Sequence, residues 1–88
     1  MKIKSGFILR DVGGKTFVVA VGERSKEFKR MITLNETGKF IWQTLEKGAT
    51  VEEVVEAIVT TYECDDRALV EKDVNIFVEK LERDDILE

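Results

Sequence analysis

The stretch at residues 31–42 reads MITLNETGKFIW, and within it the sequence changes from a strand-like to a helix-like pattern. Before this stretch, apolar positions are rich in β-branched and aromatic residues, as in β-strands. After Asn35, apolar residues recur every three or four positions, as on one face of a helix. Asn35 also suits a helix N-cap, because its side-chain oxygen can accept a free backbone N–H of the first turn. The chain is therefore expected to divide here into a sheet half and a helical half.

Two strand-like runs precede this point, FILRDV at residues 7–12 and TFVVAV at residues 16–21. Gly13 and Gly14 lie between them, which is a strong short-range signal for a β-hairpin. A third run, at residues 28–34, follows a polar loop and completes an expected three-stranded antiparallel meander.

A two-residue turn at the glycines fixes the register of the hairpin. It sets Ile8 opposite Val19 and Leu9 opposite Val18. Both faces of the hairpin then carry apolar side chains, and only one of them is needed to cover the helices. The other face is left for a neighbouring chain, a partner enzyme or a helix that wraps further.

Three helices are expected after the strands. The first spans residues 36–47, and Gly48 can adopt the left-handed conformation that ends it. Thr50 and Glu53 form a capping box at the start of the second, and the third runs from near residue 65 to about residue 83. The expected inward-facing residues are Phe40, Ile41, Thr44 and Leu45; Val51, Val54, Val55, Ile58, Val59 and Tyr62; and Val70, Val74, Phe77 and Leu81, with Leu69 and Ile76 on an adjacent stripe.

This order of elements predicts an α+β, winged-helix-like fold, in which a three-stranded antiparallel sheet is followed by three helices. A length of 88 residues fits one domain over residues 1–88. The content of 43% hydrophobic and 36% charged residues is typical of a soluble globular protein. No apolar run approaches the ~20 residues that cross a bilayer, so a cytoplasmic location without membrane contact is expected.

The residue types present argue against catalysis. The sequence has no histidine, which removes Cys-His and Ser-His pairs and ordinary zinc sites. Cys64 is the single cysteine and is expected to be a partly buried apolar residue. The spacing of Glu52, Glu53 and Glu56 fits a solvated helix face near a cap, not a metal site. We therefore expect no enzyme activity, no catalytic residue, no metal and no cofactor.

The net charge of −4 conceals an uneven distribution. Residues 1–48 hold ten Lys/Arg and five Asp/Glu, whereas residues 49–88 hold four and thirteen. Such a split can orient a charged partner over one part of the surface, although solvated faces alone also explain it.

The stretch at residues 31–42 resembles the hallmark of the PqqD family. It shows a strand ending in Leu34-Asn35, then Glu36-Thr37-Gly38, then a helix containing Ile41-Trp42. The Thr-capped segment TVEEVV at residues 50–55, the segment YECD at residues 62–65 and the long closing helix continue the similarity over nearly the whole chain.

The resemblance implies a recognition element for the leader segment of ribosomally made precursor peptides. In such elements the leader adds as a strand along the third strand, lies beside the third helix, and is presented to a modifying enzyme, often a radical SAM enzyme. Carried onto this sequence, the peptide-binding edge comprises Lys29, Arg30, Met31, Ile32 and Thr33. On the third helix, the opposing wall comprises Leu69, Asp73, Ile76, Phe77 and Lys80. Lys29 and Arg30 are expected to attract acidic leader residues, and Leu34, Asn35, Gly38 and Trp42 are interpreted as structural.

Two other functions remain open. The chain could be a structural or dimerising accessory subunit, and a homodimer is also compatible with peptide binding. It could be a winged-helix DNA-binding protein. The segment from Asp65 to Leu81 argues against DNA binding, because it carries five acidic and three basic residues. We therefore expect no nucleic-acid partner.

Overall fold

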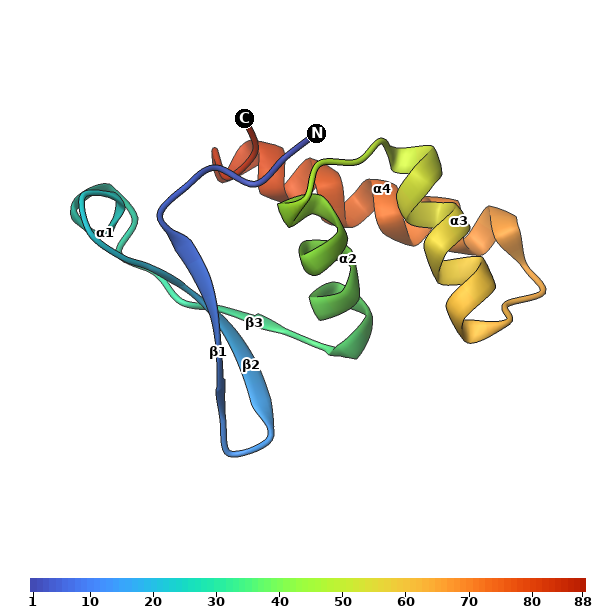
Figure 1. The fold of residues 1–88 in the computed structure, drawn as a ribbon, viewed down its shortest axis with the longest axis horizontal. Coiled ribbons are helices and arrows are strands. Elements are labelled where there is room, and N and C mark those ends of the chain that lie inside the picture. Colours follow the sequence, from blue (N-terminus) through green and yellow to red (C-terminus); the bar gives the residue numbers. More distant parts are fainter.

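A computed structural model describes all of residues 1–88 and shows a small sheet on one side and a group of helices on the other (Figure 1). The predicted α+β, winged-helix-like fold is confirmed. The elements are β1 (Phe7–Val12), β2 (Lys15–Ala20), α1 (Arg24–Glu27), β3 (Ile32–Leu34), α2 (Glu36–Glu46), α3 (Val51–Tyr62) and α4 (Arg67–Arg83).

The β1–β2 hairpin has the predicted register, with Ile8 paired with Val19 and Leu9 paired with Val18. Gly13 and Gly14 both have left-handed backbones, with φ of 58° and 79°. This conformation costs glycine little and matches the twist of the two strands. The hairpin therefore follows directly from the two glycines.

The third strand is shorter than predicted, because β3 covers only Ile32–Leu34 instead of residues 28–34. The predicted polar loop contains the single helical turn α1, and the Phe28 N–H closes that turn by donating to the Arg24 carbonyl at 2.9 Å. The Phe28 ring also packs edge-on against Phe7, with ring centroids 5.2 Å apart. Phe28 thus ends α1 and anchors it to the core, and pairing with β2 begins only at residue 32.

The helix starts agree with the sequence: Asn35 and Thr50 are the predicted caps, and the last helix starts near the predicted residue 65. Asn35 accepts a hydrogen bond from the Gly38 N–H at 2.7 Å at the start of α2. Thr50 and Glu53 form both bonds of the capping box at the start of α3. Asp66 caps α4 by accepting from the Leu69 N–H at 3.1 Å. The chain reversals between the helices are therefore encoded locally.

The core lies between the inner face of the sheet and the helices, and Trp42 and Leu45 of α2 are completely buried in it. The predicted helix stripes are confirmed only in part: half of their residues are buried, and Tyr62 and the adjacent-stripe residues Leu69 and Ile76 are exposed. The half-buried members are Phe40, Thr44, Val51, Val59, Val70 and Phe77. The core also includes Val78, which lies outside the predicted stripe of α4. The real inward face of α4 is thus rotated slightly from the predicted one. The buried residues of the three long helices are Gly38, Ile41, Trp42, Leu45, Val54, Val55, Ile58, Val74, Val78 and Leu81.

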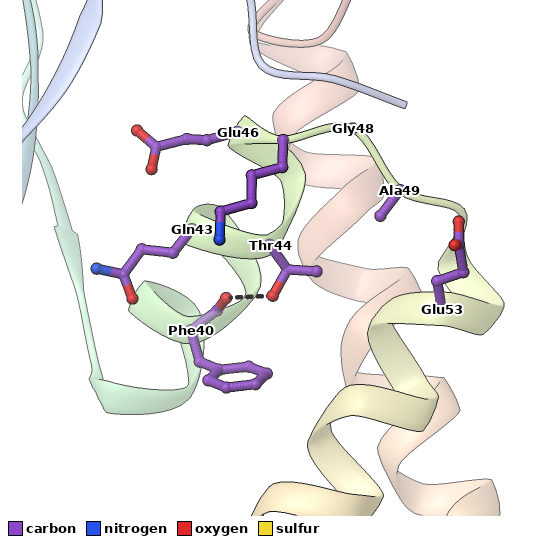
Figure 2. Close-up of a pocket in the computed structure, with 8 residues that line it drawn as sticks. Phe40, Gln43, Thr44, Glu46, Gly48, Ala49 and Glu53 are labelled. Atoms are coloured by element: carbon purple, nitrogen blue, oxygen red, sulfur yellow. Dashed lines mark hydrogen bonds between the residues drawn. The ribbon is translucent and has the colours of Figure 1, made fainter.

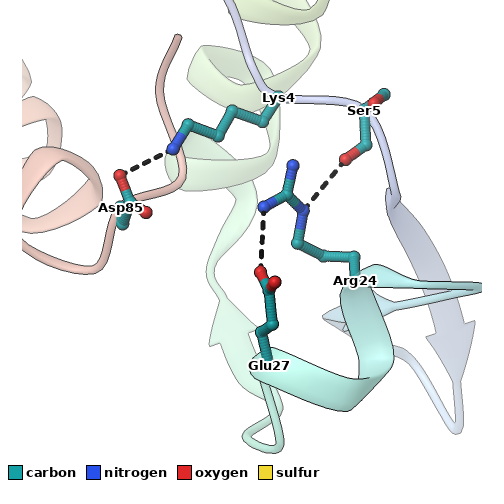
Figure 3. Close-up of polar contacts among 5 residues, drawn as sticks. All are labelled: Lys4, Ser5, Arg24, Glu27 and Asp85. Atoms are coloured by element: carbon teal, nitrogen blue, oxygen red, sulfur yellow. Dashed lines mark hydrogen bonds and ion pairs between the residues drawn. The ribbon is translucent and has the colours of Figure 1, made fainter.

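The two ends of the chain lie side by side (Figure 1). Ile3 and Leu87 form an antiparallel β-bridge, and the Lys4 side chain reaches Asp85 at 2.6 Å. Figure 3 shows that Arg24 bonds the Ser5 carbonyl nearby, which ties α1 to the same region. The hydrogen bond from Lys4 and its positive charge lower the pKa of the Asp85 carboxyl. None of the helices is long and apolar enough to cross a membrane.

Candidate functional site

One of the two edges of the sheet is on β3, and this is the edge that faces α4 across a cavity. The strand order is β1-β2-β3, so one side of β3 pairs with β2 and the other has no strand beside it. In the residues just before β3, the backbone N–H and carbonyl groups of Lys29, Arg30 and Met31 make no hydrogen bond within the chain. Backbone groups that are free in consecutive residues can pair with another extended chain. The predicted edge is thus open over residues 29–31 as well as along β3.

A cavity of about 170 Å³, called the edge cavity below, lies between β3 and α4. It brings together Ile32 and Thr33 with Phe77 and Lys80, all four predicted from the sequence as binding residues. Lys80 is the only charged residue in its lining. The complete lining is Ile32, Thr33, Leu34, Asn35, Phe77, Lys80 and Leu81.

Leu34 and Asn35 also line the edge cavity, although sequence reasoning assigned them structural roles only. Both roles are real, because Leu34 is buried and Asn35 caps α2. Leu34 and Asn35 directly follow the predicted edge at residues 29–33, and this position in the sequence could have predicted that they also line the cavity.

Gly38 sets the position of Phe77 in the wall of the edge cavity. A Cβ atom at Gly38 would lie 3.3 Å from Cε2 of Phe77 and 3.1 Å from Oδ1 of Asn35. Both contacts are tighter than normal packing tolerates without movement of a neighbour. The absence of a side chain at residue 38 therefore lets the Phe77 ring lie close to the start of α2.

Arg30 is already engaged within the protein. Its Nη2 lies 2.9 Å from Oδ1 of Asp84, and its guanidinium lies 5.1 Å from the centre of the Phe28 ring. Lys29 is exposed and forms no ion pair. Of the two basic residues predicted to attract acidic groups, Lys29 is thus the one with a free charge.

A second cavity of about 330 Å³, called the helix cavity below, opens between α2, α3 and α4. Two further predicted residues, Leu69 and Asp73, lie in its wall. Cys64 is half-buried there, as predicted. Sequence reasoning missed the cavity because its wall comes from three helices. The lining is Thr37, Ile41, Ile58, Tyr62, Cys64, Leu69, Val70, Asp73 and Val74.

Four predicted site residues line neither cavity, namely Lys29 and Arg30, described above, and Met31 and Ile76. Met31 is exposed at the edge, where its backbone is unpaired. Ile76 is 56% exposed on α4 and is not part of either wall. Its placement depends on the rotation of α4, which one sequence does not fix.

The largest hollow, of about 640 Å³, lies between α2 and the start of α3, away from β3 (Figure 2). Its wall is mostly polar or charged, and the Thr44 hydroxyl in it donates to the Phe40 carbonyl at 2.9 Å. It is lined by Phe40, Gln43, Thr44, Glu46, Lys47, Gly48, Ala49 and Glu53, a set without a nucleophile paired to a base. No group of His, Cys, Asp and Glu residues is arranged to hold a metal ion.

The shifted ionisable groups lie in surface ion pairs. The Thr16 hydroxyl and then the Lys39 ammonium donate to the Asp11 carboxyl and lower its pKa. The Glu56 carboxylate accepts from Arg67 and raises the pKa of that guanidinium. These pairs connect neighbouring elements and do not converge on either cavity.

Comparison with known proteins identifies the family. The family model described as Coenzyme PQQ synthesis protein D (PqqD) matches residues 8–87. The chain belongs to the PqqD family. The resemblance seen at residues 31–42 is thereby confirmed, and the match includes β1 to β3 as well as α2 to α4.

Two solved structures share the PqqD-family fold. TbiB1, in complex with the TbiA(beta) leader peptide, is 28% identical with a TM-score of 0.76, covering 100% of this chain and 95% of its own. A lasso peptide synthetase B1, complexed with the leader peptide, is 18% identical with a TM-score of 0.72, covering 97% and 93%. No curated protein sequence matches the chain.

Proposed function

We propose that this protein recognises the leader segment of a ribosomally made precursor peptide and presents it to a modifying enzyme, without catalysing a reaction itself. The observation that carries the proposal is the open edge of β3 beside the edge cavity. A leader peptide adds there as a fourth strand and forms main-chain hydrogen bonds with residues 29–33. Family membership and the leader-peptide complex of TbiB1 support this role.

Selectivity comes from side chains along the peptide. In a strand, alternate side chains point to opposite faces of the sheet. Those facing α4 enter the edge cavity between Ile32 and Phe77, whose apolar walls favour a small or medium apolar side chain. Lys29 and Lys80 are exposed at this site and favour acidic residues of the leader.

The partner enzyme belongs to a peptide-modifying class, and radical SAM enzymes are the first to test. Binding the leader to a separate domain raises the local concentration of the attached core peptide near the enzyme. In this role the protein itself needs neither a metal nor a cofactor. We expect it in the cytoplasm, where ribosomes make the precursor peptide.

Calorimetric titration with a synthetic leader peptide of the precursor encoded beside this protein tests the proposal. A scrambled leader of the same composition is the control. Micromolar or tighter binding of the true leader alone supports it. No binding of any neighbouring leader to the folded protein contradicts it.

One observation favours a second role as an accessory subunit. Ile8 and Val12 are exposed on the outer face of the β1–β2 hairpin, on the side away from the helices. An apolar sheet face of this kind can dock on another protein. Replacement of Val12 by Lys lowers such docking and leaves leader binding at β3 unchanged, so that pull-down and titration of one variant separate the two roles.

A further inference from the structure

The helix cavity and the edge cavity lie along one face of α4. Phe77 lines the edge cavity and Asp73 lines the helix cavity, and these residues are one helical turn apart. Thr37, two residues after Asn35, lines the helix cavity from α2. A peptide that follows β3 past Leu34 therefore reaches the opening of the helix cavity without turning away from α4.

The helix cavity is nearly twice the volume of the edge cavity, at about 330 Å³ against 170 Å³. Seven of the nine residues in its wall are hydrophobic, and Asp73 is the only charged one. Leu69 on its rim is 54% exposed. An apolar hollow with an exposed apolar rim gains free energy when a bulky apolar group fills it.

We infer that the helix cavity holds a second, bulky apolar side chain of the same leader peptide, three or four residues beyond the segment that pairs with β3. This inference rests on the proposed function. The parts of α4 that line the two cavities are centred about eight residues apart, which is about 12 Å along the helix. Extended chain rises about 3.3 Å per residue, so three or four residues span that distance.

The charges at the two cavities give the peptide a polarity. Lys80 is the charged residue of the edge cavity and Asp73 that of the helix cavity. The leader is therefore expected to carry an acidic residue near the strand segment and a Lys or Arg beside the bulky apolar residue. This pattern selects among candidate leaders by inspection of their sequences.

The test is a fluorescence anisotropy titration of the whole protein with a fluorescein-labelled synthetic leader of the precursor encoded beside it. Leu69→Asp places a charge on the rim of the helix cavity. Ile76→Asp is the matched control, because Ile76 is on the same helix, is almost equally exposed, and lines neither cavity. Loss of a buried bulky side chain predicts about tenfold weaker binding for Leu69→Asp and a change within about twofold for Ile76→Asp. Equal affinities of the two variants overturn the inference.

A second measurement uses the unchanged protein. Cys64 is the single cysteine and lies in the wall of the helix cavity, so its alkylation rate with N-ethylmaleimide reports on access to that cavity. Saturating leader slows the reaction severalfold if a side chain fills the cavity, whereas an unchanged rate overturns the inference.

Met31→Pro separates this inference from the proposed function. Suppose that the leader binds the wild type, that Met31→Pro abolishes this binding and that Leu69→Asp leaves it unchanged. Strand addition is then supported, and the inference that the leader fills the helix cavity is wrong. If the leader does not bind the folded wild type at all, the proposed function fails first.

Discussion

Arg30 and Asp84 join the segment before β3 to the end of α4 through a contact of 2.9 Å between Nη2 and Oδ1. The Asp84 side chain is only 15% exposed, and its other oxygen, Oδ2, is buried without a partner. The pair therefore links the segment before β3 directly to the residue that follows α4. Arg30 thus holds the edge of the sheet in place, in addition to any attraction that it exerts on acidic leader residues.

Arg30→Ala is therefore expected to destabilise the protein by about 1 kcal/mol, since the largely buried Asp84 carboxylate loses its partner while Arg30 itself is mostly exposed. Lys29→Ala, in the adjacent exposed residue without an ion pair, is expected to leave stability unchanged. Urea unfolding of both variants checks this difference. Equal stability of Arg30→Ala and the wild type would show that the contact contributes nothing.

Gly38→Ala is expected to weaken leader binding severalfold with little net change in stability. The new methyl group crowds Asn35 and Phe77, at 3.1 Å and 3.3 Å. The gain of about 1 kcal/mol in helix propensity offsets the crowding in the stability measurement. The displaced Phe77 ring changes the shape of the edge cavity. This change is expected to appear in the leader affinity and not in the free energy of unfolding. Gln43→Ala, exposed on the same helix, is the control, and calorimetric titration showing equal affinities for both variants would rule out this role of Gly38.

Thr50→Ala is expected to lower the free energy of unfolding by about 1 kcal/mol, because it removes the hydroxyl that accepts from the Glu53 N–H at 3.1 Å. Thr50 lines neither the edge cavity nor the helix cavity. Leader affinity of the folded variant should therefore equal that of the wild type. Thermal unfolding and titration of the same sample check both statements. A large loss of affinity would mean that leader binding depends on the overall stability of the protein and not only on the edge cavity and the helix cavity.

Asp85→Asn is expected to make stability less dependent on acid pH. The pKa of Asp85 is lowered from its ordinary 3.8 by the hydrogen bond from Lys4, so its contribution is present above pH 3.8 and is lost as the pH falls through the lower folded-state pKa. Asp85 has a left-handed φ of 60°, which Asn also tolerates. Melting curves of variant and wild type should therefore differ slightly at neutral pH and converge in acid. A difference in melting temperature that stays the same at every pH would contradict this role of the Asp85 carboxylate.

Much of the fold could be predicted because its signals are local. Gly13 and Gly14 determine the hairpin, and Asn35, Thr50 and Asp66 each mark the start of a helix through a side-chain oxygen. The prediction that the third strand begins at residue 28 was wrong. Phe28 contacts Phe7 instead, and no local sequence pattern signals this tertiary contact.

The candidate site was predicted only in part, for a related physical reason. Residues 29–33 lie at the expected edge, but the wall from α4 depends on the rotation of that helix to within one residue. Phe77 and Lys80 fall in the edge cavity, whereas Leu69 and Asp73 fall in a separate hollow. That hollow needs side chains from three helices, so it emerges only from their packing.

Amide hydrogen exchange, measured with and without saturating leader peptide, tests strand addition most directly. The N–H groups of Lys29, Arg30 and Met31 donate no hydrogen bond within the free protein, so they should exchange quickly alone. When the leader pairs with the edge, alternate N–H groups in residues 29–33, those that point toward the leader, should become protected. Protection concentrated at residues 29–33 is the predicted result. A bound leader that leaves those amides unprotected, with protection confined to β1 or to the hollow between α2 and α3, would contradict the account.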